Sequence, residues 1–500
     1  MRRSSFLLLL LPGLLAADVR LPAVLSDRMV LQSDRPIHVW GWAEPGEPVE
    51  TRFRGKSAAG AAGADGRWSL YLPPEPAGGP DTLEVRGRNR IEIRDVLVGE
   101  VWLGSGQSNM VWLLRNTTGA EDEIASANRP GMRFFKVKLD ASATPKDDVE
   151  GEWIVCSPDK IGEYSAAGYY FSRHLHEKTG APVGFIQSAW GGTPAQAWTS
   201  FETLDSDPQL HSLLVEWRQV LDEYPRAKVR HEQQMARWRE EAAAAKKAGT
   251  EAPRAPAEPR GPLHQHAPAT LYNAMIAPLT PYAIRGVIWY QGENDANQRR
   301  GYLYRRLFRE MIEDWRRAWG VGAFPFLFVQ LANYARVPET SEWPELREAQ
   351  ALTLGLANTG MAVAVDIGES GDIHPKNKRD VGDRLALAAR AVAYGERALV
   401  YSGPMYRQHT VEGDKLRLWF DHAGSGLELR GGGKGFRLAG PDGRFHEARA
   451  EVVGATIVLT SPAVRQPVAA RYAWAADPET SLFNREGLPA SPFRTDQWRD

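Results

Sequence analysis

The chain has 500 residues and a nearly even charge balance, with 61 lysine and arginine residues against 62 aspartate and glutamate residues. This balance gives no indication of the basic surface that binding to nucleic acid or to an anionic membrane needs, so we expect neither partner. The hydrophobic fraction of 43% is ample for large cores, and the length allows roughly two to four domains. The sequence does not indicate an oligomeric state.

Residues 1–17 have the pattern of a secretory signal peptide. Arg2 and Arg3 precede the short apolar run Phe6–Leu11, and small residues follow as far as Ala17. The apolar run is shorter than the ~20 residues that a membrane span needs. We therefore expect cleavage after Ala17, export to the periplasm or the extracellular space, and no membrane association afterwards.

Residues 18–95 are predicted to form an N-terminal β domain. Short apolar runs at 37–42, 68–72 and 82–85 alternate with clusters of glycine, proline and aspartate, which is typical of strands joined by tight turns. The spacing of these runs favours a small β-sandwich. Because no ionisable cluster stands out, we expect this domain to support the rest of the chain rather than to carry chemistry.

Residues 96–400 have a different sequence pattern, in which apolar segments typical of strands alternate with segments typical of helices. Continuously apolar strands in such an alternation predict a parallel sheet with helices on both faces, which is an α/β fold. Ligands of these sheets bind beyond the carboxyl ends of the strands. The expected strands are 96–103, 134–137, 183–186, 286–290, 326–331 and 361–365, and the expected helices are 165–178, 302–319, 343–357 and 377–394.

Residues 205–268 interrupt this α/β region. The part from 205 to 249 is charged and helix-prone, and the part from 250 to 268 is rich in proline and alanine, which predicts an exposed loop. His264 and His266 lie in this loop without a third candidate ligand nearby. We therefore expect no metal there.

Residues 401–500 return to short strands, expected at 416–420, 457–459 and 469–474. This pattern predicts a C-terminal β domain that resembles a second sandwich. The glycine-rich run 431–435 lacks both the Ser or Thr and the following helix of a phosphate-binding loop, so a hairpin turn is the better interpretation. We expect no cofactor.

One serine stands at the end of the first strand of the α/β region. The apolar run is followed by Gly104 and Gly106, which permit a tight turn, and then by Gln107, Ser108 and Asn109. A sharp strand-to-helix turn exposes a hydroxyl and leaves backbone N–H groups free at the helix start, which suits a nucleophilic serine. The alternative interpretation is a helix N-cap, where serine is common.

Three more polar clusters follow predicted strands. The paired Gly191 and Gly192 can point backbone N–H groups at an oxyanion. Gln291 and Glu293 offer an amide donor and a carboxylate after the next strand. His374 follows the last strand, with carboxylates close by in the sequence.

Each cluster also has an ordinary structural explanation. Paired glycines can form a plain turn, Glu293 can be a favourable charge at a helix start, and Asp372 can be a helix N-cap. Together, however, the four clusters supply a nucleophile, an oxyanion site, a base and an acid at the strand ends of one sheet. This combination is what serine-type acyl transfer needs.

Four sequence blocks resemble those of the SGNH (GDSL-like) esterases, and most of all those of the sialate O-acetylesterase group. The resemblance runs from about residue 21 to residue 493, and it implies a three-layer α/β/α hydrolase domain with a parallel sheet, flanked by β-sandwich-like domains. The blocks are Gly-Gln-Ser-Asn-Met (106–110), Trp-Gly-Gly-Thr (190–193), Trp-Tyr-Gln-Gly-Glu (289–293) and Asp-Ile-His-Pro (372–375).

The resemblance also implies catalytic roles. Ser108 would be the nucleophile and His374 the base, without a metal. The acid that orients His374 stays open, because Gly371 stands where the broad superfamily has an aspartate three residues before the histidine. Asp372 is the nearest acid, whereas related acetylxylan esterases use the glutamate that corresponds to Glu293. We slightly prefer Asp372 and keep both.

The oxyanion donors follow from the same resemblance. The backbone N–H groups of Ser108 and of Gly191 or Gly192 would hold the oxyanion. The third block of this group usually ends in Ser-Asn, but Asn294 and Asp295 stand there in this chain. The side-chain donor is therefore open, with Gln291 as the first choice and Asn294 as the second. Gln107, next to the serine, is a further candidate for binding substrate.

The sequence predicts an exported carbohydrate O-acetylesterase, with sialate as the first expected sugar. An activity on acetylated xylan or another polysaccharide is the alternative, because the sequence does not separate the two. An alternative of a different class is a non-catalytic glycan-binding protein that uses the β-sandwiches and some of the 17 tryptophans. The retained Ser108 and His374 speak against that alternative.

Overall fold

The apolar run after residue 95 forms the middle of one long strand, β7 (Arg90–Gly106), in a computed structural model that describes residues 18–498. The first half of β7 pairs with strands of the N-terminal β region, and its second half pairs with β10 and β11 of the central sheet. Every residue from Val96 to Gly106 is buried. The domain boundary predicted between residues 95 and 96 therefore falls inside a continuous strand, and the division into three domains stays a prediction.

The central sheet has the order β13-β12-β11-β7-β10-β8-β9. Its neighbouring strands are parallel, except that β9 runs antiparallel to β8 at one edge. The expected strands are all present, with ends displaced by a few residues. Their bounds are β8 (Arg129–Lys136), β9 (Trp153–Cys156), β10 (Val183–Ala189), β11 (Gly286–Tyr290), β12 (Phe326–Gln330) and β13 (Thr359–Val363).

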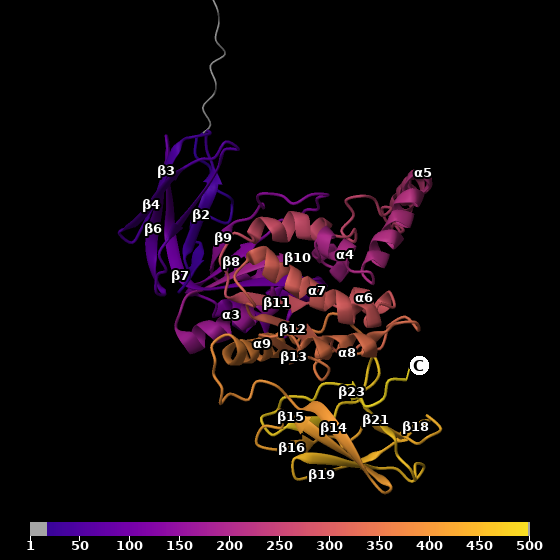
Figure 1. The fold of residues 1–500 in the computed structure, drawn as a ribbon. Coiled ribbons are helices and arrows are strands. Elements are labelled where there is room, and N and C mark those ends of the chain that lie inside the picture. Colours follow the sequence, from indigo (N-terminus) through magenta and orange to yellow (C-terminus); the bar gives the residue numbers. More distant parts are fainter. Residues whose placement is uncertain (1–17, 499–500) are drawn as a thin grey trace, which may run out of the picture.

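Helices cover both faces of this sheet (Figure 1). Successive strand residues point to opposite faces. Trp102 and Ile288 accordingly pack in one hydrophobic cluster with α3 (Ala166–Thr179) and α9 (Arg379–Val392), whereas Leu103 and Trp289 pack in another with α7 (Gly301–Trp319) and α8 (Trp343–Thr353). The predicted three-layer α/β/α fold is confirmed. Shorter helices are α1 (Ser108–Val111), α2 (Ala120–Ala125), α4 (Phe201–Ser206) and α6 (Glu293–Asn297).

The N-terminal and C-terminal β regions lie at opposite ends of the α/β region (Figure 1). In the N-terminal region β2 pairs with β5, and β3 pairs with β4 and β6. In the C-terminal region the sheets have the orders β14-β15-β20-β19, β18-β17-β21-β23 and β16-β22. The N-terminal strands are β1 (Val30–Gln32), β2 (Ile37–Trp42), β3 (Pro48–Phe53), β4 (Lys56–Ala61), β5 (Arg67–Leu72) and β6 (Gly78–Arg86). The C-terminal strands are β14 (Met405–Glu412), β15 (Lys415–Asp421), β16 (Leu427–Leu429), β17 (Phe436–Ala439), β18 (Phe445–Glu447), β19 (Arg449–Val453), β20 (Thr456–Thr460), β21 (Ala469–Tyr472), β22 (Leu482–Asn484) and β23 (Phe493–Arg494).

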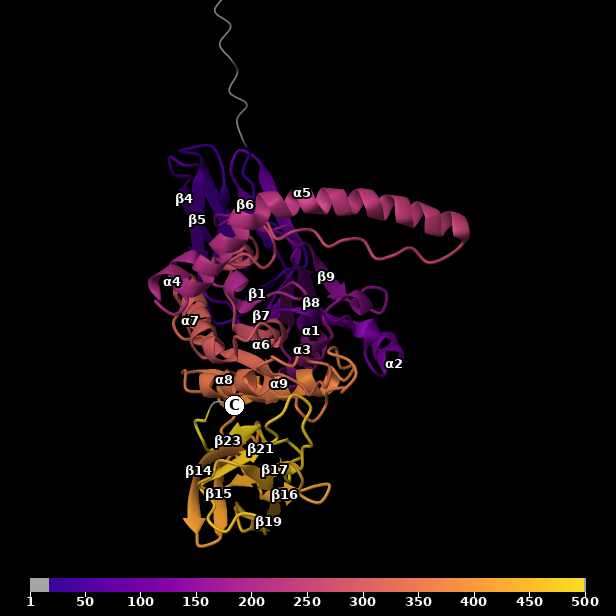
Figure 2. The same ribbon diagram turned by 90° about the vertical axis from the view of Figure 1, so that its right-hand side faces the viewer.

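The inserted segment forms a long arm. Helix α5 (His211–Ala248) projects well beyond the rest of the molecule (Figure 2). Only Leu213 and Trp217 of this helix are buried, and the helix ends at Gly249 in the left-handed conformation. The following chain runs back beside α5, where Trp238 donates a hydrogen bond of 2.7 Å to the carbonyl of Pro253. No helix within residues 18–498, α5 included, combines the length and the apolar character that a membrane span needs. The predicted signal peptide lies outside the described residues.

A fully buried arginine joins the central sheet to the C-terminal region. Arg347 on α8 donates to the carbonyls of Leu331 and Ala332 at the end of β12, at 2.8 and 2.7 Å. It also donates to the carbonyls of Ala475 and Ala476 in the C-terminal region, at 2.7 and 3.0 Å. Burial lowers the pKa of this guanidinium to about 9. Arg347 thus satisfies buried carbonyls on both sides of the contact.

We predict that Arg347→Met loosens this contact. Each buried carbonyl that loses its donor costs about 1–3 kcal/mol. We expect a lower thermal unfolding midpoint and faster amide hydrogen exchange around residues 474–477, measured by mass spectrometry. The control is Arg254→Met, because Arg254 is exposed and its removal has little effect. Exchange rates at 474–477 that match the wild type would contradict this role for Arg347.

Candidate active site

Ser108 lies at the end of β7, and the backbone of Gly106 places it there. Gly106 has φ +131°, and a Cβ atom at this position would lie 2.2 Å from the carbonyl oxygen of Tyr290. The next residue, Gln107, donates its N–H to the same carbonyl at 3.0 Å. The chain then turns into α1, whose first residue is Ser108. The Ser108 side chain is half-buried, and its hydroxyl has no hydrogen-bond partner within residues 18–498.

The loop after β10 lies beside this serine. Trp190 donates its N–H to the carbonyl of Gly106 at 3.1 Å, which ties the ends of β7 and β10 together. A Cβ atom at Gly191 would lie 3.5 Å from the Cβ atom of Ser108, whereas a Cβ atom at Gly192 would meet nothing within 4 Å. Of the two glycines predicted to hold an oxyanion, Gly191 is therefore the one next to Ser108.

The amide of Gln291, the first choice for the side-chain oxyanion donor, is fully engaged elsewhere. Its Nε2 donates to the carbonyl of Thr193 at 3.2 Å and to Asp295 Oδ2 at 2.5 Å. Its Oε1 accepts a hydrogen bond of 2.9 Å from the Tyr304 hydroxyl. Asp295 also accepts the N–H of Ala195 at 3.0 Å. Gln291 and Asp295 thus fix the loop that carries Gly191 and leave Gln291 no hydrogen to donate to a ligand.

Asn294, the second choice, keeps a hydrogen free. It is half-buried, and its Nδ2 donates to the carbonyl of Gly192 at 2.8 Å, which uses one of its two hydrogens. Its backbone N–H donates to Gln107 Oε1 at 3.2 Å. Gln107 therefore connects the serine turn to α6. This is a supporting contact, and a role of Gln107 in substrate binding stays a prediction.

His374 lies in the loop after β13 and is joined to the serine helix by a ring contact. Its imidazole stacks on the indole of Trp112, directly after α1, with ring centroids 5.1 Å apart. Its imidazole Nδ1 lies 3.7 Å from Asp372 Oδ1. The same oxygen accepts a hydrogen bond of 2.9 Å from the backbone N–H of His374. Burial lowers the pKa of His374, and the Asp372 carboxylate opposes this shift. No hydrogen bond joins His374 to Ser108 within residues 18–498, so the two side chains are tied only through α1.

Glu293, the competing acid, faces a different neighbour. It is buried, and its Oε1 accepts a hydrogen bond of 2.5 Å from Asn109 Nδ2. Asn109 Nδ2 also donates to the carbonyl of Ile373 at 3.0 Å. Among the described residues, Oε2 of Glu293 has no partner, and burial raises the pKa of this carboxyl. Glu293 reaches the histidine loop only through Asn109, whereas Asp372 stands next to His374 itself.

Lys378 completes a buried polar cluster with Asn109 and Glu293. The Lys378 ammonium donates to Asn109 Oδ1 at 2.8 Å and to the carbonyl of Pro375. It also lies 5.7 Å from the ring centroid of Trp112. Burial lowers the pKa of Lys378 to about 7. The cluster ties α1, α6 and the histidine loop together, and so it holds the loop of His374 against the helix that begins at Ser108.

Sequence reasoning missed Lys378. It stands at the start of a predicted helix, in the polar run Lys376-Asn377-Lys378, where a solvated charge is the ordinary interpretation. The only available signal was its spacing of four residues after His374.

A cavity of about 830 Å³ is lined in part by Gly191, the glycine that approaches Ser108. Tyr164 and Trp190 provide aromatic surface in its lining. Lys138 is paired with Glu150 at 2.6 Å, whereas the Lys136 ammonium donates only to the carbonyl of Glu163, at 3.3 Å. Among the described residues no carboxylate pairs with Lys136. The lining residues are Val111, Leu113, Lys136, Val137, Lys138, Leu139, Glu150, Gly151, Glu152, Tyr164, Gln187, Ala189, Trp190 and Gly191.

Other reactive groups do not compete with this site. Burial raises the pKa of the Cys156 thiol to about 12, so it stays protonated and inert. His264 and His266 lie with their rings 4.7 Å apart, but nowhere in residues 18–498 do three His, Cys, Asp or Glu side chains converge as metal ligands. The site thus offers a hydroxyl, backbone and amide donors, and a largely neutral imidazole beside a carboxylate. These are the groups that acyl transfer to a serine uses.

Comparison with known proteins agrees with this chemistry. Residues 260–391 match the family model described as carbohydrate esterase, sialic acid-specific acetylesterase. The chain is 32% identical to the sialate O-acetylesterase of Mus musculus over 428 residues, which is 77% of this chain and 75% of the relative. The human sialate O-acetylesterase is 30% identical over 79% of this chain and 76% of its own length. The crystal structure of a carbohydrate acetylesterase from Xanthomonas citri aligns with a TM-score of 0.82 and 41% identity, covering 96% of this chain and 100% of that one.

We predict that Lys378→Met slows acyl transfer although Lys378 touches no substrate. Loss of the ammonium frees Asn109 and the carbonyl of Pro375, and small displacements of reacting groups cost about 10- to 100-fold in rate. We expect such a fall in kcat for hydrolysis of 4-nitrophenyl acetate, with KM changed much less. The control is Lys376→Met, because Lys376 is exposed two residues away. Equal losses in both variants, or none in either, would refute the role of the buried polar cluster.

Proposed function

The chain belongs to the sialate O-acetylesterase family, and we propose that it removes the acetyl group of O-acetylated sialate through an acyl-enzyme on Ser108. It is a carboxylic-ester hydrolase and a carbohydrate O-acetylesterase. The observation that supports the proposed mechanism is the close approach of Gly191 to Ser108, where an added Cβ at Gly191 would lie 3.5 Å from the Cβ atom of the serine.

In the first step, His374 accepts the Ser108 proton while Oγ attacks the acetyl carbonyl carbon. The imidazole must be neutral for this step, and its lowered pKa favours the neutral form at neutral pH. The carbonyl oxygen then carries a negative charge. The sugar oxygen leaves as a hydroxyl after it takes the proton from His374. In the second step a water molecule, deprotonated by His374, attacks the acetyl carbonyl carbon. The bond from that carbon to Ser108 Oγ then breaks, Oγ takes the proton back from His374, and acetate leaves.

The oxyanion is proposed to be held by the backbone N–H groups of Ser108 and Gly191 and by Asn294 Nδ2. Gly191 is preferred over Gly192 because only Gly191 approaches the Ser108 side chain. Asn294 is preferred over Gln291 because one of its amide hydrogens is still available. Gln291 is assigned instead to the support of the Gly191 loop. Donors fixed in this way stabilise the charge that develops in the transition state.

Asp372 is proposed as the acid that orients His374. It is the carboxylate next to the imidazole, at 3.7 Å from Nδ1. Its hydrogen bond to the backbone N–H of His374 holds the loop in a fixed shape. Glu293 is proposed to position Asn109 and, through it, the same loop.

The sugar is proposed to lie in the cavity beside Gly191. Tyr164 and Trp190 offer aromatic surface for the apolar faces of a sugar ring. Lys136 has no carboxylate partner among the described residues, and it offers a counter-charge for the carboxylate of sialate. Acetylated xylan would make no use of that charge, and this is the observation that favours sialate over the polysaccharide alternative.

We also propose that the protein is exported, on the basis of the signal-like pattern of residues 1–17. The absence of a second cysteine agrees with an exported chain whose stability depends on its hydrophobic cores rather than on disulfides.

We predict that Ser108→Ala removes turnover and leaves the fold intact. Acetate release is measured by proton NMR from 9-O-acetyl sialic acid, acetylated xylan and acetylated monosaccharides. Wild-type protein is expected to release acetate fastest from the sialate, and the variant is expected to lose at least about 10³-fold in rate, as serine hydrolases do without their nucleophile. Undiminished release by a folded Ser108→Ala protein would rule out the acyl-enzyme. Faster release from xylan would reject sialate as the substrate.

Asp372→Asn and Glu293→Gln are predicted to differ in their pH profiles. The acid limb of kcat/KM is expected to have its midpoint below pH 6.5, because activity appears as His374 loses its proton and burial lowers that pKa. Asp372 raises the pKa of His374, so Asp372→Asn should lower kcat and move the acid limb to still lower pH. Glu293→Gln should leave the midpoint in place. The reverse result would make Glu293 the orienting acid.

A further inference from the structure

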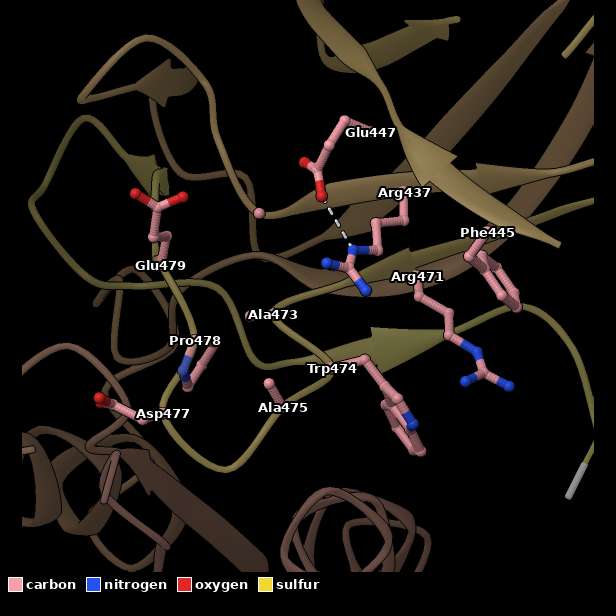
Figure 3. A pocket seen from close by; sticks show the side chains of 11 residues that line it. Arg437, Phe445, Glu447, Arg471, Ala473, Trp474, Ala475, Asp477, Pro478 and Glu479 are labelled. Atoms are coloured by element: carbon pink, nitrogen blue, oxygen red, sulfur yellow. Dashed lines mark hydrogen bonds and ion pairs between the residues drawn. The ribbon is translucent and has the colours of Figure 1, made fainter. Parts of the chain in front are cut away.

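The C-terminal β region contains a cavity that the esterase mechanism does not use. It has a volume of about 500 Å³ and lies on the outer surface of the sheet β18-β17-β21-β23 (Figure 3). Arg437 faces Glu447 on one neighbouring strand and Arg471 on the other, so all three side chains share this face of the sheet. The lining residues are Gly435, Arg437, Phe445, Glu447, Arg471, Ala473, Trp474, Ala475, Asp477, Pro478 and Glu479.

The lining offers hydrogen-bond donors with unused capacity. Arg437 uses only its Nε, which donates to Glu447 Oε1 at 3.0 Å, and among the described residues its two terminal nitrogens have no partner. The indole N–H of Trp474 likewise has no acceptor within residues 18–498, and Trp474 is half-buried. Figure 3 shows the Arg437 guanidinium reaching from its strand toward the segment that carries Ala473.

The same lining offers acceptors on the opposite side. Asp477 Oδ1 accepts a hydrogen bond of 2.8 Å from Asn333, and Glu479 Oε1 accepts one of 2.9 Å from Lys434. Within residues 18–498, the second oxygen of each of these carboxylates has no hydrogen-bond partner. Figure 3 shows Asp477, Pro478 and Glu479 together on the side of the cavity away from Phe445. Donors and acceptors therefore surround a common space.

The position of the cavity is fixed by the contact between the C-terminal region and the α/β region. Arg347 holds the carbonyls of Ala475 and Ala476, and Tyr334 donates its N–H to Ala476 at 3.1 Å. The Trp474 ring is packed by two guanidinium groups, with the Arg494 carbon 4.9 Å and the Arg471 carbon 5.7 Å from its centroid. The walls are thus set before any ligand arrives, as in binding sites that are largely pre-formed.

We infer that this cavity binds an uncharged sugar unit of a glycan chain, separately from the esterase site. A sugar hydroxyl both donates and accepts hydrogen bonds, so it can use Arg437 and the indole N–H as well as the free carboxylate oxygens. The apolar face of a sugar ring packs against aromatic surface, and the part of Trp474 that lines the cavity, not covered by Arg471 and Arg494, supplies it.

Charge argues for an uncharged ligand. The cavity wall carries three carboxylates, from Glu447, Asp477 and Glu479, against the two guanidinium groups of Arg437 and Arg471, so an anionic sugar would meet a net negative wall. A purely apolar ligand would leave these groups without water. A metal ion is a poor occupant, because no three carboxylates in the described part of the chain converge on one point.

The test uses the full chain with Ser108→Ala, so that no turnover disturbs the measurement. Binding of xylohexaose, cellohexaose, lactose and 3′-sialyllactose is measured by isothermal titration calorimetry. We expect at least one neutral sugar to bind, and Trp474→Ala to weaken it about threefold to tenfold, the range for loss of one aromatic contact. Arg437→Met should weaken the same sugar, and it serves as the second variant because Arg437 is largely exposed and its loss leaves the fold intact. The matched control is Trp419→Ala, which removes an exposed tryptophan from the other sheet of the same region.

The outcomes separate this site from the esterase site. In a protein that retains Ser108, Trp474→Ala should keep the wild-type kcat on 4-nitrophenyl acetate, because Trp474 lies outside the esterase site. Sugar binding is measured separately, so a failure of the esterase assignment would leave the binding result unaffected. Three results would overturn the inference. They are no binding of any neutral sugar, binding that Trp474→Ala and Arg437→Met leave unchanged, and binding of sialyllactose alone that depends on Trp474.

Discussion

The close approach of Gly106 to the carbonyl of Tyr290 is the constraint on which the site depends. Three strand ends meet there, because Gln107 donates to the Tyr290 carbonyl of β11 and Trp190, after β10, donates to the carbonyl of Gly106. A side chain at residue 106 would occupy the space of that carbonyl. These backbone contacts fix the turn that follows β7, and this turn places Ser108 beside Gly191. The position of Ser108, the proposed nucleophile, thus follows from backbone packing rather than from any contact of the serine itself.

The second constraint is electrostatic. Asn109, immediately after the serine, uses its amide to accept from Lys378 and to donate to Glu293 and to the carbonyl of Ile373. Burying a carboxyl group and an ammonium group is costly unless each has partners, and here one amide serves both. Glu293 keeps an oxygen without a partner among the described residues, so the cluster is held at some cost in stability. We interpret this loss of stability as the consequence of fixing the histidine loop on α1, because functional sites commonly lower the stability of the fold that carries them.

Sequence patterns predicted the architecture well because the rules for parallel sheets are strict. Continuously apolar strands must be covered on both faces, and their carboxyl ends must lie at one edge, so Ser108, Gly191, Gln291 and the histidine loop were expected to meet. The continuity of β7 through residue 95 was not foreseeable, because the strand changes its pairing partners there rather than ending. The projection of α5 away from the molecule could not be predicted either, because a charged amphipathic pattern predicts a helix but not its orientation relative to the other elements.

The details of the site were less accessible to sequence reasoning. Whether an amide is free depends on what it already contacts. Gln291 is engaged by Asp295, four residues further on, and by Thr193, which is too distant in the sequence for any local pattern to indicate the contact. The burial of Lys378 was also hidden from sequence reasoning, because its polar sequence neighbours predict an exposed side chain whereas the residue is fully buried. The roles of the individual side chains therefore stay proposals that chemistry must test.

The most direct test of the central claim is covalent labelling by diisopropyl fluorophosphate, which reports an activated serine without reference to any sugar. Wild-type protein and His374→Ala are incubated with the reagent, and the modified peptide is located by mass spectrometry. The account predicts a single adduct on Ser108 of the wild-type protein and labelling that is slower by orders of magnitude in His374→Ala. An adduct on another residue, or equal labelling of Ser108 in both proteins, would contradict it.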